Sequence, residues 1–309
     1  MNGHWHRRGL LIAAPAPQIW AHSHAALPTP DLIEEGQMDV YFSPRDEDGR
    51  AHIALARVET SGPDGELRLF EHSPEPILSP GPLGAFDDSG VTMSCVVHSG
   101  GTTFLYYTGW TLGVTVPFYF YVGLAVRRPG GRAFERVSAG PILERTAVDP
   151  YLTASPWVIQ DHGIWRMWYV SGLGWKQVNG EPQHRYHIRY AESEDGVVWL
   201  RDGRVSIDFA DASEYAMSRP CVVKDDDCYR MWFSARGDRY RLGYAESPDG
   251  LSWHRDDRRG GLQPARRGWD SEMLAYPAII DHGNARYLLY NGNGYGRTGI
   301  GYAMAKRGS

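Results

Sequence analysis

The strongest constraint on the fold is an internal repeat, because three segments of the chain follow one pattern. In each segment a proline precedes an aromatic residue by 13 positions, and weaker copies of this spacing run from Ser94 to Tyr107 and from Thr29 to Phe42. The three clear copies are SPWVIQDHGIWRMWYVSG (155–172), RPCVVKDDDCYRMWFSARG (219–237) and YPAIIDHGNARYLLYNGNG (276–294). The five anchors, at positions 29, 94, 156, 220 and 277, recur at a nearly fixed period, which indicates a repeat architecture.

Each repeat continues with a second pair of predicted strands. These pairs are AHIALARVETSGPDGELRLFE (51–71), FYVGLAVRRPGGRAFERV (120–137), YHIRYAESEDGVVWLRD (186–202) and YRLGYAESPDGLSWHRD (240–256). Asp-Gly or Gly-Gly between β-forming runs is a hairpin signal, and about four short strands make one propeller blade. We therefore expect an all-β chain that folds as one five-bladed β-propeller domain over 1–309. The expected four-stranded antiparallel blades span about 22–71, 87–137, 149–202, 213–256 and 270–304.

The fifth repeat lacks an outer strand of its own, because the sequence ends soon after GIGYAMAKRGS begins. The segment WHRRGLLI (5–12) is similar to the outer strands WLRDGRVSI (199–207) and WHRDD (253–257). We expect 5–12 to complete the last blade, since this would cover an open sheet edge and close the ring.

Composition excludes several classes of protein. The net charge is −5 with no basic stripe, so no nucleic-acid partner is expected, and no apolar run is long enough to span a membrane. The three cysteines, Cys95, Cys221 and Cys228, are too few and too irregularly spaced for a disulfide framework. Cys95 and Cys221 occupy equivalent strand positions, so we expect buried, reduced thiols and a cytoplasmic protein. No tight cluster of metal ligands is present, and neither a metal nor another cofactor is expected.

The longest loops lie between repeats and between the two hairpins of a repeat. In an antiparallel blade these loops share the face at which the innermost strands begin, and long loops commonly carry function. We therefore expect a pocket on this face. The loops are 72–91, 108–118, 138–153, 171–185, 203–217 and 258–274.

Polar residues recur at the start of the innermost strands. Seven positions before the anchors stand His22, Asp87, Asp149, Ser213 and Asp270, with His24, Asp88, Glu214 and Glu272 nearby and Ser155, Arg219 and Tyr276 next to the anchor prolines. Any one of these acids could instead cap a turn. A structural role for all of them is disfavoured, because acids along an axis contribute little to packing.

Aromatic residues accompany these acids on the same loops. Flat apolar rings beside carboxylates suit a pyranose, which has an apolar face and a hydroxyl rim; packing between blades is the alternative for each ring. The candidates are Trp110, Tyr151, Trp175, Tyr215, Trp269 and Tyr276. The two S-x-D-G-x-x-W motifs (193–199 and 247–253) are instead interpreted as turns on the opposite face.

Over nearly its full length the chain resembles the five-bladed propeller glycosidases. These include family 43 arabinanases and xylosidases, family 32 invertases and family 130 mannoside phosphorylases. The resemblance is carried by FDDSGVTMSCVVHSGGTTFLYYTGW (86–110), DPYLTASPWVIQDHGIWRMWYVSG (149–172), EYAMSRPCVVKDDDCYRMWFSARG (214–237) and the AESxDGxxW hairpins.

The resemblance implies three acids: a base or nucleophile on blade 1, a stabilising Asp on blade 2, and a proton donor on or near blade 3. Asp87 or Asp88 matches the second acid, and Asp149 or Glu214 is a candidate for the third. Blade 1 departs from the pattern, because AHSHAALPTP offers histidines where a carboxylate is expected.

Three functions remain open. The leading hypothesis is a glycosidase-like enzyme that acts on a small glycoside or oligosaccharide, with Glu214 or Asp149 as general acid and Asp87, Asp88 or Asp270 ionised. The second is an inverting phosphorylase whose phosphate pocket would be drawn from Arg219, Arg239, Arg241, His22 and His24. The third is a sugar-binding or biosynthetic-pathway protein without hydrolytic activity. The missing acid of blade 1 favours the second and the third.

Overall fold

The computed structural model describes residues 5–15, 18, 20–34, 36–62, 65–226 and 228–307. This part of the chain is almost entirely β-structure, with only the short 3-10 helices η1 (Asp257–Arg259) and η2 (Asn293–Gly296). None of the described helices is long and apolar enough to cross a membrane.

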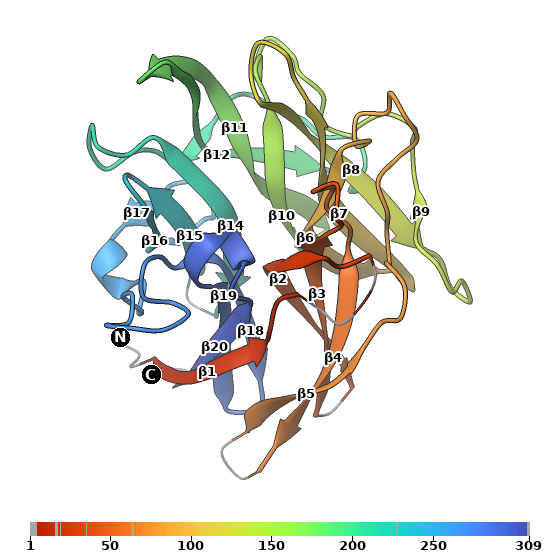
Figure 1. Cartoon of the computed structure of the whole chain (residues 1–309), viewed down its shortest axis with the longest axis vertical. Helices are drawn as coiled ribbons and strands as arrows, with labels where there is room; N and C mark the ends of the chain where they lie inside the picture. Colours follow the sequence, from red (N-terminus) through yellow and green to blue (C-terminus); the bar gives the residue numbers. More distant parts are fainter. Residues whose placement is uncertain are drawn as a thin grey trace.

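The strands pair mainly with their sequence neighbours, in antiparallel order, so the sheets follow the repeats (Figure 1). The first sheet contains β2 (Ser23–Glu34), β3 (Gln37–Arg45), β4 (Ala54–Ser61) and β5 (Glu66–His72). The second contains β6 (Gly90–Ser99), β7 (Thr102–Leu112), β8 (Phe118–Arg127) and β9 (Glu135–Arg136).

Repeats 3 and 4 form one continuous sheet, because a single parallel pair, Tyr186 with Ala216, joins them. Repeat 3 supplies β10 (Thr153–Asp161), β11 (Ile164–Val178), β12 (Glu181–Ser193) and the short β13 (Val205–Ile207). Repeat 4 supplies β14 (Ala216–Lys224), β15 (Tyr229–Arg236), β16 (Tyr240–Ser247) and β17 (His254–Arg255). The last sheet contains β18 (Ala275–His282), β19 (Ala285–Asn291), β20 (Ile300–Lys306) and β1 (His6–Ile12).

The first strands of the repeats surround a common axis. Strands β2, β6, β10, β14 and β18 contact one another in this order, and β18 contacts β2 again (Figure 1). The same kind of hydrogen bond recurs between neighbouring repeats. A polar side chain near the end of the second strand of one repeat accepts from a backbone N–H near the start of the first strand of the following repeat. The pairs are Ser43 with Met93, Thr108 with Ser155, Ser234 with Tyr276, and Asn291 with Leu27, at 2.7–2.8 Å.

A β-bulge lies at the anchor prolines of the three clear repeats, between Ala154 and Trp157 in repeat 3 and at the corresponding places in repeats 4 and 5. In repeat 1 the equivalent bulge lies between Ala26 and Thr29, so the anchor is Pro28 rather than Thr29 as the spacing predicts. The hairpin of repeat 1 has a further irregularity after Leu32, which adds a residue between the anchor and Phe42.

The predicted N-terminal strand is confirmed, because β1 pairs antiparallel with β20 as the outer strand of the last sheet. The Arg7 guanidinium also forms an ion pair of 3.0 Å with Asp270, whose side chain is only 4% exposed. Both a backbone ladder and a buried charge pair therefore attach this strand to the fifth repeat.

Arg219 occupies the centre of the ring and is fully buried. From β14 its guanidinium donates to the carbonyls of Met93 and Ser94 on β6, and to the Pro28 carbonyl and the Thr29 hydroxyl on β2, at 2.6–2.9 Å. It also lies 5.7 Å from the centre of the Trp157 ring on β10. One side chain thus connects the first strands of four repeats.

The remaining core is apolar and aromatic. Cys95 and Cys221 are buried and unpaired as predicted, and each sulfur lies 3.1–3.4 Å from a backbone N–H of the next repeat.

The two S-x-D-G-x-x-W motifs are turns, as predicted. Asp195 and Asp249 each accept two backbone N–H bonds within the motif.

The attachment of β1 can be tested with two neighbouring arginines. Arg7→Ala removes the ion-pair partner of the buried Asp270, whereas Arg8→Ala removes a pair with the exposed Glu66. We expect Arg7→Ala to lower the free energy of unfolding by about 3 kcal/mol, and Arg8→Ala by less than about 1 kcal/mol. Urea unfolding measures both, and equal effects would contradict the structural role of Arg7.

The central arginine can be tested by Arg219→Lys, which keeps the charge but loses the planar fork of donors. We expect the free energy of unfolding to fall by about 2–4 kcal/mol, because buried carbonyls lose their donors. The exposed variant Arg239→Lys is the control. A parent-like urea midpoint for Arg219→Lys would show that the ring does not depend on this side chain.

Candidate functional site

Four of the acids predicted at the start of the first strands, one in each of repeats 2 to 5, form ion pairs within their own repeat. In each case the partner is an arginine of the outermost strand or of the segment that precedes it. The pairs are Asp87 with Arg136 (2.8 Å), Asp149 with Arg201 (3.0 Å), Glu214 with Arg255 (2.7 Å) and Asp270 with Arg7 (3.0 Å). The recurrence of one pairing in four repeats indicates that these acids close each sheet on itself.

A tyrosine completes the pairing in repeats 2, 3 and 5. The hydroxyls of Tyr107, Tyr169 and Tyr290 each donate to the aspartate 20 residues earlier, at 3.0 Å. Repeat 4 has Glu214 instead of an aspartate, and Phe233, which has no hydroxyl, takes the place of the tyrosine; the Arg255 guanidinium lies 5.2 Å from its ring. The acid and the aromatic residue thus change together, as expected of a structural pair.

Asp149 is the most enclosed of the predicted catalytic acids. Its carboxylate is fully buried and accepts from the hydroxyls of Tyr169 and Ser171 and from Arg189 and Arg201. Four donors surround this carboxylate and leave no access for a leaving group. This geometry favours a structural role over general acid catalysis.

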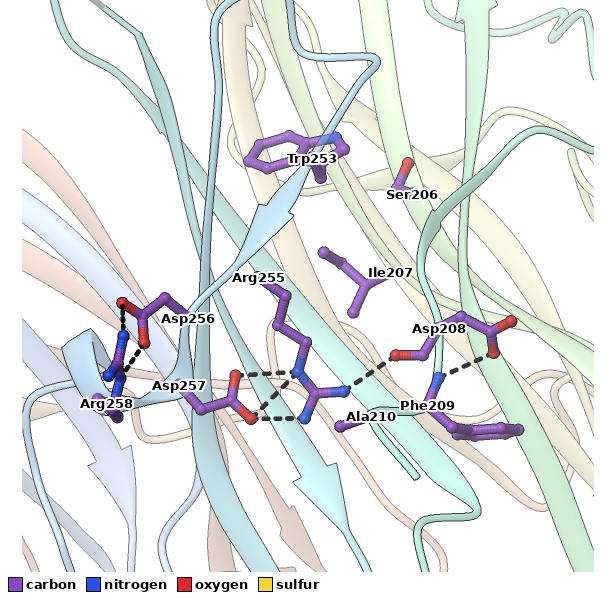
Figure 2. A pocket seen from close by; sticks show the side chains of 10 residues that line it. All are labelled: Ser206, Ile207, Asp208, Phe209, Ala210, Trp253, Arg255, Asp256, Asp257 and Arg258. Carbon is purple, nitrogen blue, oxygen red and sulfur yellow. Dashed lines mark hydrogen bonds and ion pairs between the residues drawn. The ribbon is translucent and has the colours of Figure 1, made fainter. Parts of the chain in front are cut away.

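Glu214, the other candidate for the proton donor, holds Arg255 through two hydrogen bonds of 2.7 and 2.8 Å. Arg255 borders a cavity of about 470 Å³ between the outer strands of repeats 3 and 4 (Figure 2). There the guanidinium also donates to Asp257 and to the Asp208 carbonyl. Arg255 and Arg258 in this cavity are paired with Asp257 and Asp256, whereas the Asp208 carboxylate is exposed and accepts from the Phe209 N–H.

The other predicted polar residues are dispersed. Asp88 accepts from Gly84 and Ser89 and closes a turn, while Glu272 is exposed and lies 3.9 Å from Arg239. His22 is exposed on the chain before β2. Arg219, expected in a phosphate pocket, is corrected to a structural role because its burial and its bonds to β2 and β6 leave it inaccessible.

The predicted aromatic residues divide into two groups. Trp175 and Tyr215 are half-buried and belong to one aromatic network, since His184 lies 5.8 Å from each ring centre. Tyr151 is 43% exposed and lies over Gly174 near the same hairpin. Trp110 packs against Gly90 at the end of β7, and Trp269 stacks on Tyr290 at 5.2 Å, so both serve packing.

Tyrosines, arginines and histidines from several repeats gather around Tyr240 and Tyr276. We name this set the axial cluster. The Tyr186 and Tyr240 hydroxyls are 2.9 Å apart, and the Tyr240 ring lies 5.8 Å from Tyr276 and 6.0 Å from Tyr295. The members are His24, Arg45, His184, Tyr186, Arg236, Tyr240, Tyr276, Tyr295 and Arg297.

Charge interactions extend the axial cluster from repeat 4 to repeat 1. Arg236 lies 5.4 Å from the centres of the Tyr240 and Tyr295 rings. Burial raises the pKa of the Tyr276 hydroxyl, while Arg45 and Arg236 both act on it in the opposite direction, so this phenol lies within reach of both charges. Desolvation is the main cause of the lowered pKa of Arg45, although its side chain is partly open to solvent.

The two histidines of the axial cluster are held neutral. Burial, together with Arg45 and Arg297, lowers the pKa of His24 to about 4. Burial, together with Arg236, lowers the pKa of His184 to about 4. Among the residues that the structure describes, none of Arg45, Arg236 and Arg297 forms an ion pair with a carboxylate. The cluster is therefore basic and aromatic rather than acidic.

His24 and Tyr276, two of the candidates from the sequence, both lie near Arg45, whereas the other members of the axial cluster were not among the candidates. A signal for two of them exists: FSPR (42–45) and FSAR (233–236) place Arg45 and Arg236 at equivalent ends of β3 and β15. Tyr295 and Arg297 follow β19 in a segment with no counterpart in the other repeats, so no repeat pattern could reveal them.

The neutral state of His24 predicts a pH dependence of stability. The unfolded chain binds a proton near pH 6.5 and the folded one near pH 4, so this stability is present above pH 6.5 and is lost as the pH falls toward 4. His24→Asn removes the titration and suits the φ of +62° at this position. We expect the fall in unfolding free energy from pH 7 to pH 4.5 to shrink by about 2 kcal/mol in urea titrations. The exposed His254→Asn is the control, and a parent-like fall in His24→Asn would contradict the neutral state.

Comparisons with known proteins identify the family and the fold. No protein-family model matches the sequence. The uncharacterized protein MT1551 of Mycobacterium tuberculosis (strain CDC 1551 / Oshkosh) is 44% identical over 300 residues, which cover 97% of this chain and 98% of that protein. A thermostable family-43 glycoside hydrolase has a TM-score of 0.67 at 16% identity, over 96% of each chain. A GH32 beta-fructofuranosidase of Bombyx mori in complex with sucrose has a TM-score of 0.62 at 16% identity, over 94% of this chain and 62% of the other. The chain therefore belongs to the family of MT1551 and has the β-propeller fold found in glycoside hydrolases of families 43 and 32.

Proposed function

We propose that this chain is a five-bladed propeller that recognises a carbohydrate at its axial cluster, without cleaving it by a pair of carboxylates. The blade count is supported by the contacts of β2, β6, β10, β14 and β18 in a ring. The proposed blades keep the bounds expected from the repeats, with 5–12 as the outer strand of the fifth. Repeats 3 and 4 count as two blades, because only one parallel pair of residues joins them.

The observation that carries the proposal is the placement of the acids. The candidate acids of repeats 2 to 5 are held by arginines at 2.7–3.0 Å, and repeat 1 has histidines in place of an acid. A general acid must come within hydrogen-bond reach of the leaving oxygen, and a second carboxylate must lie across the scissile bond. Groups buried in ion pairs at the edges of separate sheets do not meet this requirement.

Carbohydrate recognition is supported by the side chains that remain accessible. Tyr295 is 36% exposed, Tyr151 is 43% exposed, and Trp175 is half-buried, so these rings are available to stack on the apolar face of a sugar. Arginine and tyrosine donors beside them suit hydroxyl groups. Solved proteins with this fold include glycoside hydrolases, one of them in complex with sucrose, which makes a sugar the ligand class to test first.

Phosphorolysis is the second candidate, and the positive charge of the axial cluster favours it. Arg45 and Arg297, next to the expected His24, would supply the positive charge of the phosphate pocket in place of Arg219. Such an enzyme would still need one proton donor, for which Glu214 remains the first choice. Hydrolysis with Glu214 or Asp149 as general acid is the third candidate.

Carbohydrate recognition predicts a loss of binding when an accessible ring of the axial cluster is removed. Tyr295→Asn keeps a residue that tolerates the φ of +60° and removes the ring. We expect about 3- to 10-fold weaker binding on a glycan array and in calorimetry with the best array ligand. Phe70→Ala, which removes an exposed ring on β5, should bind like the parent. Equal binding by Tyr295→Asn and the parent would place the site elsewhere.

The absence of carboxylate catalysis predicts that Glu214→Gln changes stability rather than chemistry. The variant weakens the pairing with Arg255, so we expect a lower urea midpoint, while Glu194→Gln at an exposed turn should leave it unchanged. We expect no cleavage of glycosides by the parent, with or without phosphate. If the parent cleaves a glycoside and folded Glu214→Gln loses about 10²–10⁴-fold in rate, one of the enzyme candidates is correct instead.

A further inference from the structure

The axial cluster contains three positive charges that the protein itself does not neutralise. Within the described ranges, Arg45, Arg236 and Arg297 have no carboxylate partner, although the arginines of the outer strands nearby are paired. Two of them lie close enough to interact, because the pKa of Arg45 is lowered by desolvation and also by the charge of Arg297. Like charges that remain close together in a partly desolvated place are stabilised when an anion binds between them.

Arg236 is held in a fixed position within this set. Its guanidinium lies 5.2–5.4 Å from the ring centres of Tyr215, Tyr240 and Tyr295, so aromatic faces surround it where a carboxylate usually would. The Arg236 Nε and the neighbouring His184 Nε2 are both buried and have no hydrogen-bond partner among the described residues. Unpaired buried polar atoms are costly, and two of them in one cluster point to an external acceptor or donor.

The surrounding rings limit what kind of anion would fit. Tyr276 lies within the influence of both Arg45 and Arg236, and Tyr295 combines an exposed ring with contact to Arg236. A ligand at this place would therefore contact guanidinium groups, which suit the oxygens of a phosphate or carboxylate. It would also contact the flat apolar faces of tyrosine rings, which suit a sugar ring.

We infer that the axial cluster binds a sugar through an oxyanion group, a phosphate or a carboxylate, which is held by Arg45, Arg236 and Arg297. This inference rests on the proposed function, that the cluster recognises carbohydrate. It adds that the charged group of the ligand accounts for most of the preference for a charged glycan over its neutral counterpart. A hydrogen bond to a charged group commonly changes affinity by about 10- to 100-fold.

The test uses the full chain on an array of neutral, phosphorylated and uronate-containing glycans, with calorimetry on the best ligand of each class. We expect bound glycans to carry phosphate or carboxylate, with at least about tenfold preference over the neutral counterpart. Arg45→Ala and Arg297→Ala should each remove about tenfold of that affinity, because both side chains are exposed and unpaired and their loss should leave the fold intact. Arg204→Ala, which removes a half-exposed arginine paired with Asp202, is the control and should bind like the parent.

The outcomes separate the inference from the proposed function. Preference for phosphorylated glycans alone, or for uronates alone, supports the inference and identifies the oxyanion. Equal binding of neutral glycans, unchanged in Arg45→Ala and Arg297→Ala, overturns the inference and leaves carbohydrate recognition standing. Binding of inorganic phosphate without binding of any glycan overturns the proposed function, and the inference with it.

Discussion

The buried guanidinium of Arg219 is the contact on which the centre of the ring depends. Innermost strands that converge on an axis leave backbone carbonyls that have no strand partner on that side, and an unpaired buried carbonyl is costly. Arg219 supplies several donors in one rigid fork and reaches Met93 and Ser94 on one strand and Pro28 on another. Burial lowers its pKa only to about 10, so the side chain stays charged and can bind these carbonyls at neutral pH.

Arginine side chains also satisfy buried acceptors at the outer edge of repeats 2 to 5, but there the acceptor is a carboxylate rather than a backbone carbonyl. There a carboxylate from the loop before the first strand meets an arginine from the outermost strand, as in Asp87 with Arg136. Breaking such a buried pair leaves one charge without compensation, which strongly disfavours opening the sheet. Because Arg7 supplies this group for the last repeat, the N-terminal strand is attached to it by the same chemistry that closes repeats 2 to 4.

Acidic and basic groups are divided between the edges of the sheets and the axial cluster. Carboxylates are used at the edges of the sheets, and the axial cluster retains arginines, neutral histidines and tyrosines. A fold that glycoside hydrolases also have can therefore present a surface whose chemistry is basic and aromatic. The proposed site is formed by loops and strand ends, and two of its residues, Tyr186 and Tyr276, also join neighbouring repeats.

The repeat spacing alone determined the all-β architecture and the place of the N-terminal strand, because hairpin turns and strand periodicity are local properties of the chain. It also identified the buried cysteines and the turn motifs. It could not determine the role of Asp87, Asp149, Glu214 and Asp270, since their partners lie 41 to 263 residues away and only pairing of the outer strands brings them together. Nor could it separate Arg219 from Arg45 and Arg236. Whether an arginine is buried on a closed axis or remains without a carboxylate partner at its rim depends on which strands surround it, and this is decided only when the ring is formed.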